Sequence, residues 1–139
     1  MSVIPYITLN GRCAEALAFY EKALGATIDS VATFAQSPMH ERTPPEWRDK
    51  VMHAGFTVAG SRLYAGDGMP GGANKPIGGV TFSIITDDVA EAERMFDALA
   101  ESGHVGMPLQ ETFWAERWGM VTDQFGVPWM VNGRPKRGS

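Results

Sequence analysis

The chain contains an internal duplication, and this feature limits its possible folds more than any other. The segment Ala14-Glu15-Ala16, followed by Phe19-Tyr20, recurs as Ala90-Glu91-Ala92, followed by Met95-Phe96, with the same spacing in both halves. A repeat of this kind indicates that one supersecondary unit occurs twice. We therefore interpret the two halves as copies of the same unit.

Each copy predicts one helix with recognisable ends. Apolar residues recur at helical spacing in both copies, and each stripe is followed by a glycine that can end a helix, Gly25 or Gly103. In the second copy Asp88 and Glu91 have the spacing of a capping box. We expect the two helices near residues 12–24 and 88–101.

One short apolar segment precedes each helix, and three segments with the composition of strands follow it. The turn sequences Ala59-Gly60 and Asp123–Gly126 predict hairpins. A sheet with a helix on one face leaves its other face free to curl into a cleft. The predicted fold class is therefore α+β, with two tandem βαβββ modules forming a cup-shaped sheet. The predicted strands are 3–9, 27–34, 50–58 and 61–65, then 80–85, 104–110, 117–122 and 127–132.

The duplication also predicts the domain organisation. The segment between the halves is rich in glycine and proline, which is typical of a linker or a flexible lid. Its Asn74-Lys75-Pro76 sequence lacks the Gly-Lys-Ser/Thr pattern of a phosphate loop. We expect one domain over residues 1–139, made of module 1 (about 1–66), a linker (about 67–78), module 2 (about 79–133) and a flexible tail (134–139).

Composition excludes several classes of protein. The single Cys13 cannot form an intramolecular disulfide, and no Cys/His cluster has zinc spacing. The net charge is −4, and the only basic cluster is in the tail, at Arg134, Lys136 and Arg137, so no nucleic-acid partner is expected. No signal peptide and no apolar run of membrane-spanning length is found, so no membrane partner is expected. These features predict a cytoplasmic protein.

Several stretches carry a resemblance to a known family. They are Tyr6, Ala14–Ala16, Phe19-Tyr20, Lys50–Ala54, Met107–Leu109, Thr112–Trp114, Gly119–Asp123 and Phe125–Asn132. With these motifs the chain resembles the PhnB-like branch of the glyoxalase, bleomycin-resistance and extradiol-dioxygenase superfamily, also called vicinal oxygen chelate. The resemblance implies paired modules, a cup-shaped site in each, and commonly a homodimer.

The resemblance also implies a divalent metal in many members, held by His or Glu on the first, fourth and last strands. The matching positions in this chain include Pro5, Thr81 and Met130, and the fourth strand offers no carboxylate or imidazole before Asp67. Such metals need imidazole, thiolate or carboxylate ligands. We therefore expect no metal and no other cofactor.

The strongest candidate for chemistry is His53. Strand alternation places it on the face opposite Ala54, Phe56 and Val58, which would pack on the helix. His53 would then face the cup as a possible base, although a hydrogen-bonded core histidine fits the same pattern. Aromatic and methionine side chains could complete a ligand site. The predicted ligand-binding residues are Tyr64, Trp114, Trp118, Met120 and Met130, whereas Trp129 is expected in the core.

These residues leave several functions open. The leading interpretation is a protein that binds a small organic molecule without a metal. A lyase or isomerase using His53 as general base is one alternative, and a protein that sequesters an antibiotic is another. An interaction module without a ligand is a weaker one.

Overall fold

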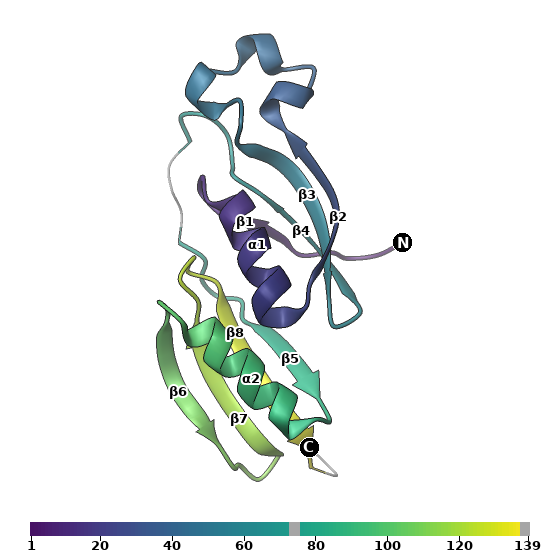
Figure 1. Cartoon of the computed structure of the whole chain (residues 1–139), viewed down its shortest axis with the longest axis vertical. Helices are drawn as coiled ribbons and strands as arrows, with labels where there is room; N and C mark the ends of the chain where they lie inside the picture. Colours follow the sequence, from purple (N-terminus) through teal and green to yellow (C-terminus); the bar gives the residue numbers. More distant parts are fainter. Residues whose placement is uncertain (73–75, 137–139) are drawn as a thin grey trace. The chain divides into compact units, whose positions relative to one another are not determined.

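The computed structural model describes residues 1–72 and 76–136. The chain divides into two compact units, Met1–Lys75 and Pro76–Ser139. In the described part of the chain, each unit contains one α-helix and one four-stranded sheet (Figure 1). The prediction of two tandem βαβββ modules in an α+β fold is confirmed.

The first unit has the strand order β1-β4-β3-β2 in its sheet. β1 pairs with β4 in parallel, and the other neighbours are antiparallel. Three short 3-10 helices fill the connection between β2 and β3, where the sequence predicted an irregular excursion. The elements are β1 (Tyr6–Thr8), α1 (Cys13–Leu24), β2 (Thr27–Thr33), η1 (Phe34–Gln36), η2 (His40–Arg42), η3 (Pro45–Trp47), β3 (Val51–Val58) and β4 (Ser61–Gly66).

The second unit repeats this topology with the order β5-β8-β7-β6. β5 is parallel to β8, and β8 and β6 are both antiparallel to β7. The two helices begin and end at positions that match the sequence repeat. The elements are β5 (Phe82–Thr86), α2 (Val89–Ala100), β6 (His104–Gln110), β7 (Ala115–Thr122) and β8 (Pro128–Pro135).

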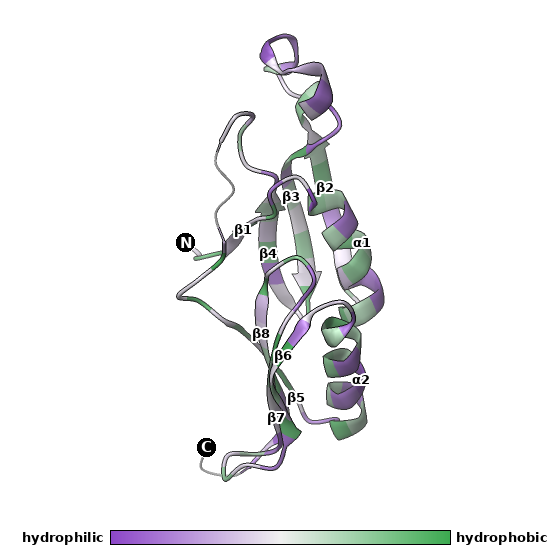
Figure 2. Cartoon of the chain, turned by 90° about the vertical axis from the view of Figure 1, so that its left-hand side faces the viewer, coloured by the Kyte–Doolittle hydropathy of each residue, from purple (hydrophilic) through white to green (hydrophobic). Residues whose placement is uncertain are grey.

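In each unit the helix packs on one face of the sheet and forms the core there (Figure 2). In the first unit the ring of Tyr20 on α1 stacks on Phe56 of β3, with centroids 6.0 Å apart. In the second unit a Cβ added at Gly119 would lie 2.8 Å from Phe96 Cε2, so the absence of a side chain lets α2 approach β7 closely. Within the described residues, the opposite face of each sheet carries no α-helix of its own unit.

The helix ends agree with the sequence except at one position. Gly25 ends α1 with φ of 64°, in the left-handed region. The Asp88 side chain accepts a hydrogen bond from the Glu91 backbone N–H, as expected of a cap. The expectation for Gly103 was wrong, because the left-handed residue after α2 is Ser102, with φ of 57°. The role of Gly103 is steric instead: a Cβ at this position would collide with the Thr122 carbonyl oxygen.

The ends of the modules differ from the sequence boundaries. β8 continues to Pro135, so Arg134 and Pro135 lie in a strand that the sequence assigned to the tail. Residues 73–75, which include Asn74 and Lys75 of the linker, and residues 137–139 of the tail lie outside the described part of the chain. No helix in the described residues is both long and apolar enough to cross a membrane.

Candidate functional site

The face of the first sheet opposite α1 brings together polar and aromatic side chains from three strands. Strand alternation in β3 is as predicted, because Ala54, Phe56 and Val58 are buried toward α1 while His53 points to the other side. We call this side the first open face. It comprises Tyr6 of β1, His53, Gly55 and Thr57 of β3, and Arg62 and Tyr64 of β4.

His53 lies beside two tyrosine rings on this face. Its ring centroid is 4.8 Å from that of Tyr64 and 5.7 Å from that of Tyr6. The pairing of β1 with β4 places Tyr6 directly opposite Tyr64, so both tyrosines reach the same imidazole. Within the described residues neither nitrogen of the half-buried imidazole forms a hydrogen bond. His53 therefore has a fixed aromatic environment and free hydrogen-bonding capacity.

Tyr6 is held in place by its hydroxyl group. The hydroxyl donates a hydrogen bond to the Met52 carbonyl oxygen at 3.0 Å. The same hydroxyl lies against Gly66, because a Cβ added at Gly66 would collide with the Tyr6 oxygen. Burial raises the pKa of Tyr6, and the electrostatic interaction with the neighbouring Cys13 and Asp67 side chains raises it further. Tyr6 is therefore protonated at neutral pH and acts as a donor to Met52.

The other end of the first open face is charged. The Asp29 carboxylate on β2 accepts a hydrogen bond from Thr57 Oγ1 at 2.9 Å. The Arg62 guanidinium lies 3.8 Å from the same carboxylate oxygen, and its Cζ is 5.8 Å from the Tyr64 centroid. Tyr64 thus contacts an imidazole and a guanidinium.

The second sheet has an open face of different chemistry. Gly119 faces Phe96 of α2, so its neighbours Trp118 and Met120 in β7 point to the opposite side. Register places Met130 of β8 opposite Met120, and Asn132 opposite Trp118. These four residues define the second open face, which is mainly apolar.

The three tryptophans named from the sequence adopt two different roles. The Trp114 ring packs edge-on against Trp118, with centroids 5.3 Å apart, and against Phe113, at 4.8 Å. Phe113 is 86% exposed. Trp129 is buried, and its indole N–H donates to Asp123 Oδ2 at 2.9 Å, which confirms its assignment to the core. The indole N–H groups of Trp114 and Trp118 form no hydrogen bond within the described residues.

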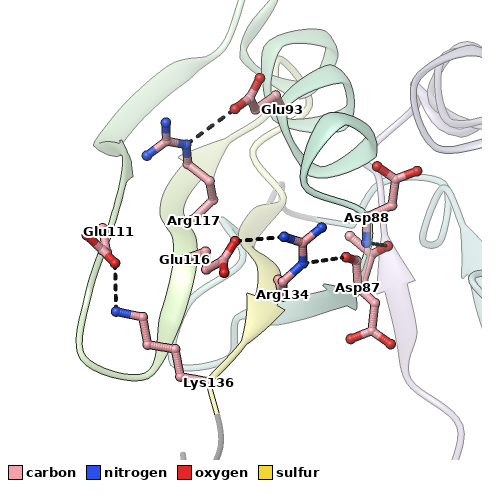
Figure 3. Close-up of polar contacts among 9 residues, drawn as sticks. Asp87, Asp88, Glu93, Glu111, Glu116, Arg117, Arg134 and Lys136 are labelled. Atoms are coloured by element: carbon pink, nitrogen blue, oxygen red, sulfur yellow. Dashed lines mark hydrogen bonds and ion pairs between the residues drawn. The ribbon is translucent and has the colours of Figure 1, made fainter.

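Ion pairs connect several elements of the second unit (Figure 3). Arg117 of β7 donates to Glu93 of α2 at 3.3 Å, and Arg134 of β8 donates to Glu116 at 3.1 Å. Arg134 also donates to the Asp87 carbonyl oxygen at 3.2 Å. All of these side chains are well exposed, and exposed pairs contribute at most about 1 kcal/mol each to stability. We interpret them as surface contacts.

The predicted site residues fall into two groups. His53 and Tyr64 are in contact in the first unit, whereas Trp114 and Trp118 are in contact in the second. Met120 and Met130 are paired across β7 and β8. Tyr6 belongs to the first group, although the sequence pattern did not predict it as a site residue. A βαβββ module pairs its first and fourth strands in parallel, and this pairing brings Tyr6 beside Tyr64. The order of the strands was therefore the signal that could have identified Tyr6.

The residues present do not fit the divalent metal that the resemblance implies. The Pro5 carbonyl oxygen accepts a hydrogen bond from the Tyr64 N–H at 2.9 Å, so its position belongs to the backbone ladder. Both carboxylate oxygens of Asp67 accept backbone hydrogen bonds. Over residues 1–72 and 76–136, no group of three or more His, Cys, Asp or Glu side chains could hold a metal ion.

Comparison with known proteins gives consistent similarities. A family model described as the Glyoxalase/Bleomycin resistance protein/Dioxygenase superfamily matches residues 4–131. Protein YjdN of Escherichia coli (strain K12) is 37% identical over 140 residues, which cover 95% of this chain and 95% of that protein. The crystal structure of protein PA1353 from Pseudomonas aeruginosa has 45% sequence identity and a TM-score of 0.86, covering 96% of this chain and 98% of that one. A PhnB protein from Bacillus cereus has the same fold at 20% identity, with a TM-score of 0.77 and coverage of 95% and 98%.

Proposed function

Because the chain belongs to the Glyoxalase/Bleomycin resistance protein/Dioxygenase superfamily, we propose that it binds a small organic molecule on the first open face without a divalent metal. The observation that carries this proposal is the environment of His53. Its imidazole contacts the rings of Tyr64 and Tyr6, yet neither nitrogen has a hydrogen-bond partner in the described chain. A core histidine in a structural network would use at least one of these nitrogens.

The first open face can orient a planar ligand by two kinds of contact. The rings of Tyr64 and His53 offer a surface for stacking, which is favourable for flat apolar groups. The free imidazole nitrogens can donate to or accept from a carbonyl, hydroxyl or amide group of the ligand. The Tyr6 hydroxyl is already bonded to Met52 and serves to position the ring. Planar molecules that carry a carbonyl group are therefore the class we propose.

The second open face is a further candidate for apolar ligands. Trp114 and Trp118 are half-buried and have unused indole N–H groups in the described structure, and Met120 and Met130 lie on the same side. Methionine side chains adapt their shape to different apolar groups. We propose that Trp118 contributes stacking and that the methionines contribute apolar contact.

The free imidazole also favours a second function, in which His53 acts as a general base. A lyase or isomerase of this kind removes a proton from a carbon next to a carbonyl group. The nitrogens of His53 have no hydrogen-bond partner in the described residues, so one of them is free to accept such a proton. The reaction would require no metal.

A thermal-shift screen of metabolites and antibiotics tests the proposal. A ligand that binds only the folded state raises the melting temperature. We expect stabilising compounds for the wild type, and a smaller shift for the same compounds with His53→Ala. Stabilisation by an antibiotic that is recovered unchanged would favour sequestration, and conversion of a metabolite would favour the base mechanism. Compounds that stabilise wild type and His53→Ala equally would contradict the first open face as the site.

We also propose that the protein is a cytoplasmic homodimer. Phe113 is an apolar side chain with 86% exposure, and Val105 and Met107 of the edge strand β6 are also exposed. Contacts between copies commonly cover such residues. Light scattering at micromolar concentration is expected to give twice the mass of one chain, and a monomer mass would contradict the proposal.

A further inference from the structure

We propose that Arg62 makes the first open face selective for planar ligands that carry a carboxylate. The inference rests on the proposed function, because it assumes that a ligand binds beside His53 and Tyr64. It goes further by naming the charge of the ligand and the side chain that recognises it. Three features support it: the position of Arg62, the long distance between its guanidinium and Asp29, and the side chains that surround Gly55.

Arg62 lies within reach of a ligand stacked at Tyr64. The two residues are separated by one position in β4, so their side chains share a face of the sheet. The Arg62 Cζ is 5.8 Å from the Tyr64 centroid, and the same ring is 4.8 Å from His53. A planar molecule stacked on the Tyr64 ring would therefore lie close to both the Arg62 guanidinium and the His53 imidazole.

Arg62 is held less tightly than Arg117 and Arg134 of the second unit. Its distance to Asp29 Oδ2 is 3.8 Å, which is too long for a hydrogen bond, and that oxygen already accepts from Thr57. Arg117 and Arg134, by contrast, each donate hydrogen bonds at 3.1–3.3 Å. The Arg62 side chain is also 51% exposed. Its five N–H donors are thus available to an incoming acceptor.

The surroundings of Gly55 add a second donor. A Cβ at this position would lie 3.2 Å from Ser30 Oγ, 3.5 Å from Tyr64 Cε1 and 3.6 Å from an Arg62 terminal nitrogen. The hydroxyl, the ring and the guanidinium therefore converge on one point of the sheet. Arginine binds a carboxylate through two parallel hydrogen bonds, and a hydroxyl can donate a third. The nearby Asp29 carboxylate repels negative charge, so a ligand with two carboxylates is expected to bind more weakly than a ligand with one.

Calorimetric titration with two probes of the same shape tests the inference. 2-Naphthoate carries a carboxylate at neutral pH, and 2-naphthamide is its neutral counterpart. We expect wild-type protein to bind the acid about tenfold more tightly than the amide, since a charge-assisted hydrogen bond is the main difference. Arg62→Gln is expected to reduce this preference to about twofold or less, mainly by weakening the binding of the acid. Arg117→Gln removes the same charge from a surface ion pair and should retain the preference.

The outcomes separate this inference from the proposed function. If wild type binds both probes with equal affinity, Arg62 does not select the ligand, while the proposed binding site remains supported. If Arg62→Gln keeps the preference for the acid, the selectivity comes from another group and the inference is wrong. If wild type binds neither probe, the result counts against both the inference and the ligand site. Loss of the preference in Arg117→Gln as well would show a general charge effect and would also overturn the assignment.

Discussion

The backbone N–H of Cys13 donates a hydrogen bond of 2.8 Å to Oδ1 of Asp67, which lies 54 residues later in the chain. The same oxygen accepts from the Gly11 N–H at 2.9 Å, and Oδ2 accepts from the Val51 N–H at 2.8 Å. Arg12, at the N-cap position of α1, provides no side-chain cap. Asp67 therefore caps α1 from a distance and joins the helix start to β3, in a position where its negative charge also faces the positive end of the helix dipole.

Removal of this carboxylate is expected to destabilise the first unit strongly. Asp67→Ala leaves three backbone N–H groups without their partner, and we expect a loss of about 3–5 kcal/mol in the free energy of unfolding. Urea denaturation followed by circular dichroism measures the change. Asp97→Ala, at an exposed position of α2, is the control and should stay within about 0.5 kcal/mol of wild type. Equal stability of the two variants would contradict the role of Asp67.

Ionisation of the buried Cys13 thiol is expected to lower the free energy of unfolding at alkaline pH. Burial raises its pKa from the ordinary 9.0 to about 12, and the Asp67 carboxylate adds to the shift. Because the pKa is higher in the folded state, this contribution is fully present below about pH 9 and is lost as pH rises toward 12. In that window one such group changes the free energy of unfolding by up to about 1.4 kcal/mol per pH unit. Urea titrations at several pH values should show a shallower decline for Cys13→Ala, whereas identical slopes would contradict the prediction.

Gly66 is expected to tolerate no side chain. A Cβ there would collide with the Tyr6 hydroxyl and lie 2.9 Å from the Met52 carbonyl oxygen. We expect Gly66→Ala to lower the free energy of unfolding by about 1–3 kcal/mol through overpacking. Gly78→Ala is the matched control, because a Cβ at Gly78 would meet no heavy atom within 4 Å and the φ of this residue is not positive. A melting temperature for Gly66→Ala equal to that of the control would show that Tyr6 is not fixed as described.

His53 is expected to contribute little to folding. Its imidazole forms no hydrogen bond in the described residues, so His53→Ala should change the free energy of unfolding by no more than about 1 kcal/mol. A core histidine in a buried network would cost about 3 kcal/mol or more. Chemical denaturation distinguishes the two values. The larger loss, with ligand affinity unchanged, would restore the interpretation of His53 as a core residue.

The sequence predicted the local elements because their signals are local. Helical spacing gave both helices to within one residue, and strand alternation gave the side of the sheet to which His53 points. The βαβββ order followed from the repeat. These features depend on neighbours within a few positions, and the sequence contains that information directly.

The parts that depend on long-range pairing were not predicted. The contact between Tyr6 and His53 requires the register in which Tyr6 lies opposite Tyr64, and no local pattern sets that register. The role of Asp67 depends on backbone groups of α1 and β3 that approach only in the folded unit. Ser102 rather than Gly103 adopts the left-handed conformation, and the lack of a side chain at Gly103 allows its close approach to Thr122, a contact between distant parts of the unit.

The most direct test of the account is the imidazole NMR spectrum of the protein during titration with the compound that stabilises it most in the thermal-shift screen. The chain has three histidines, so His40 and His104 serve as internal references for His53. Both references lie at exposed positions outside the first open face. If the ligand binds beside Tyr64 and Tyr6, the His53 resonance will shift and saturate with the binding curve while the other two stay unchanged. A ligand that saturates the protein without moving the His53 resonance would contradict the central claim.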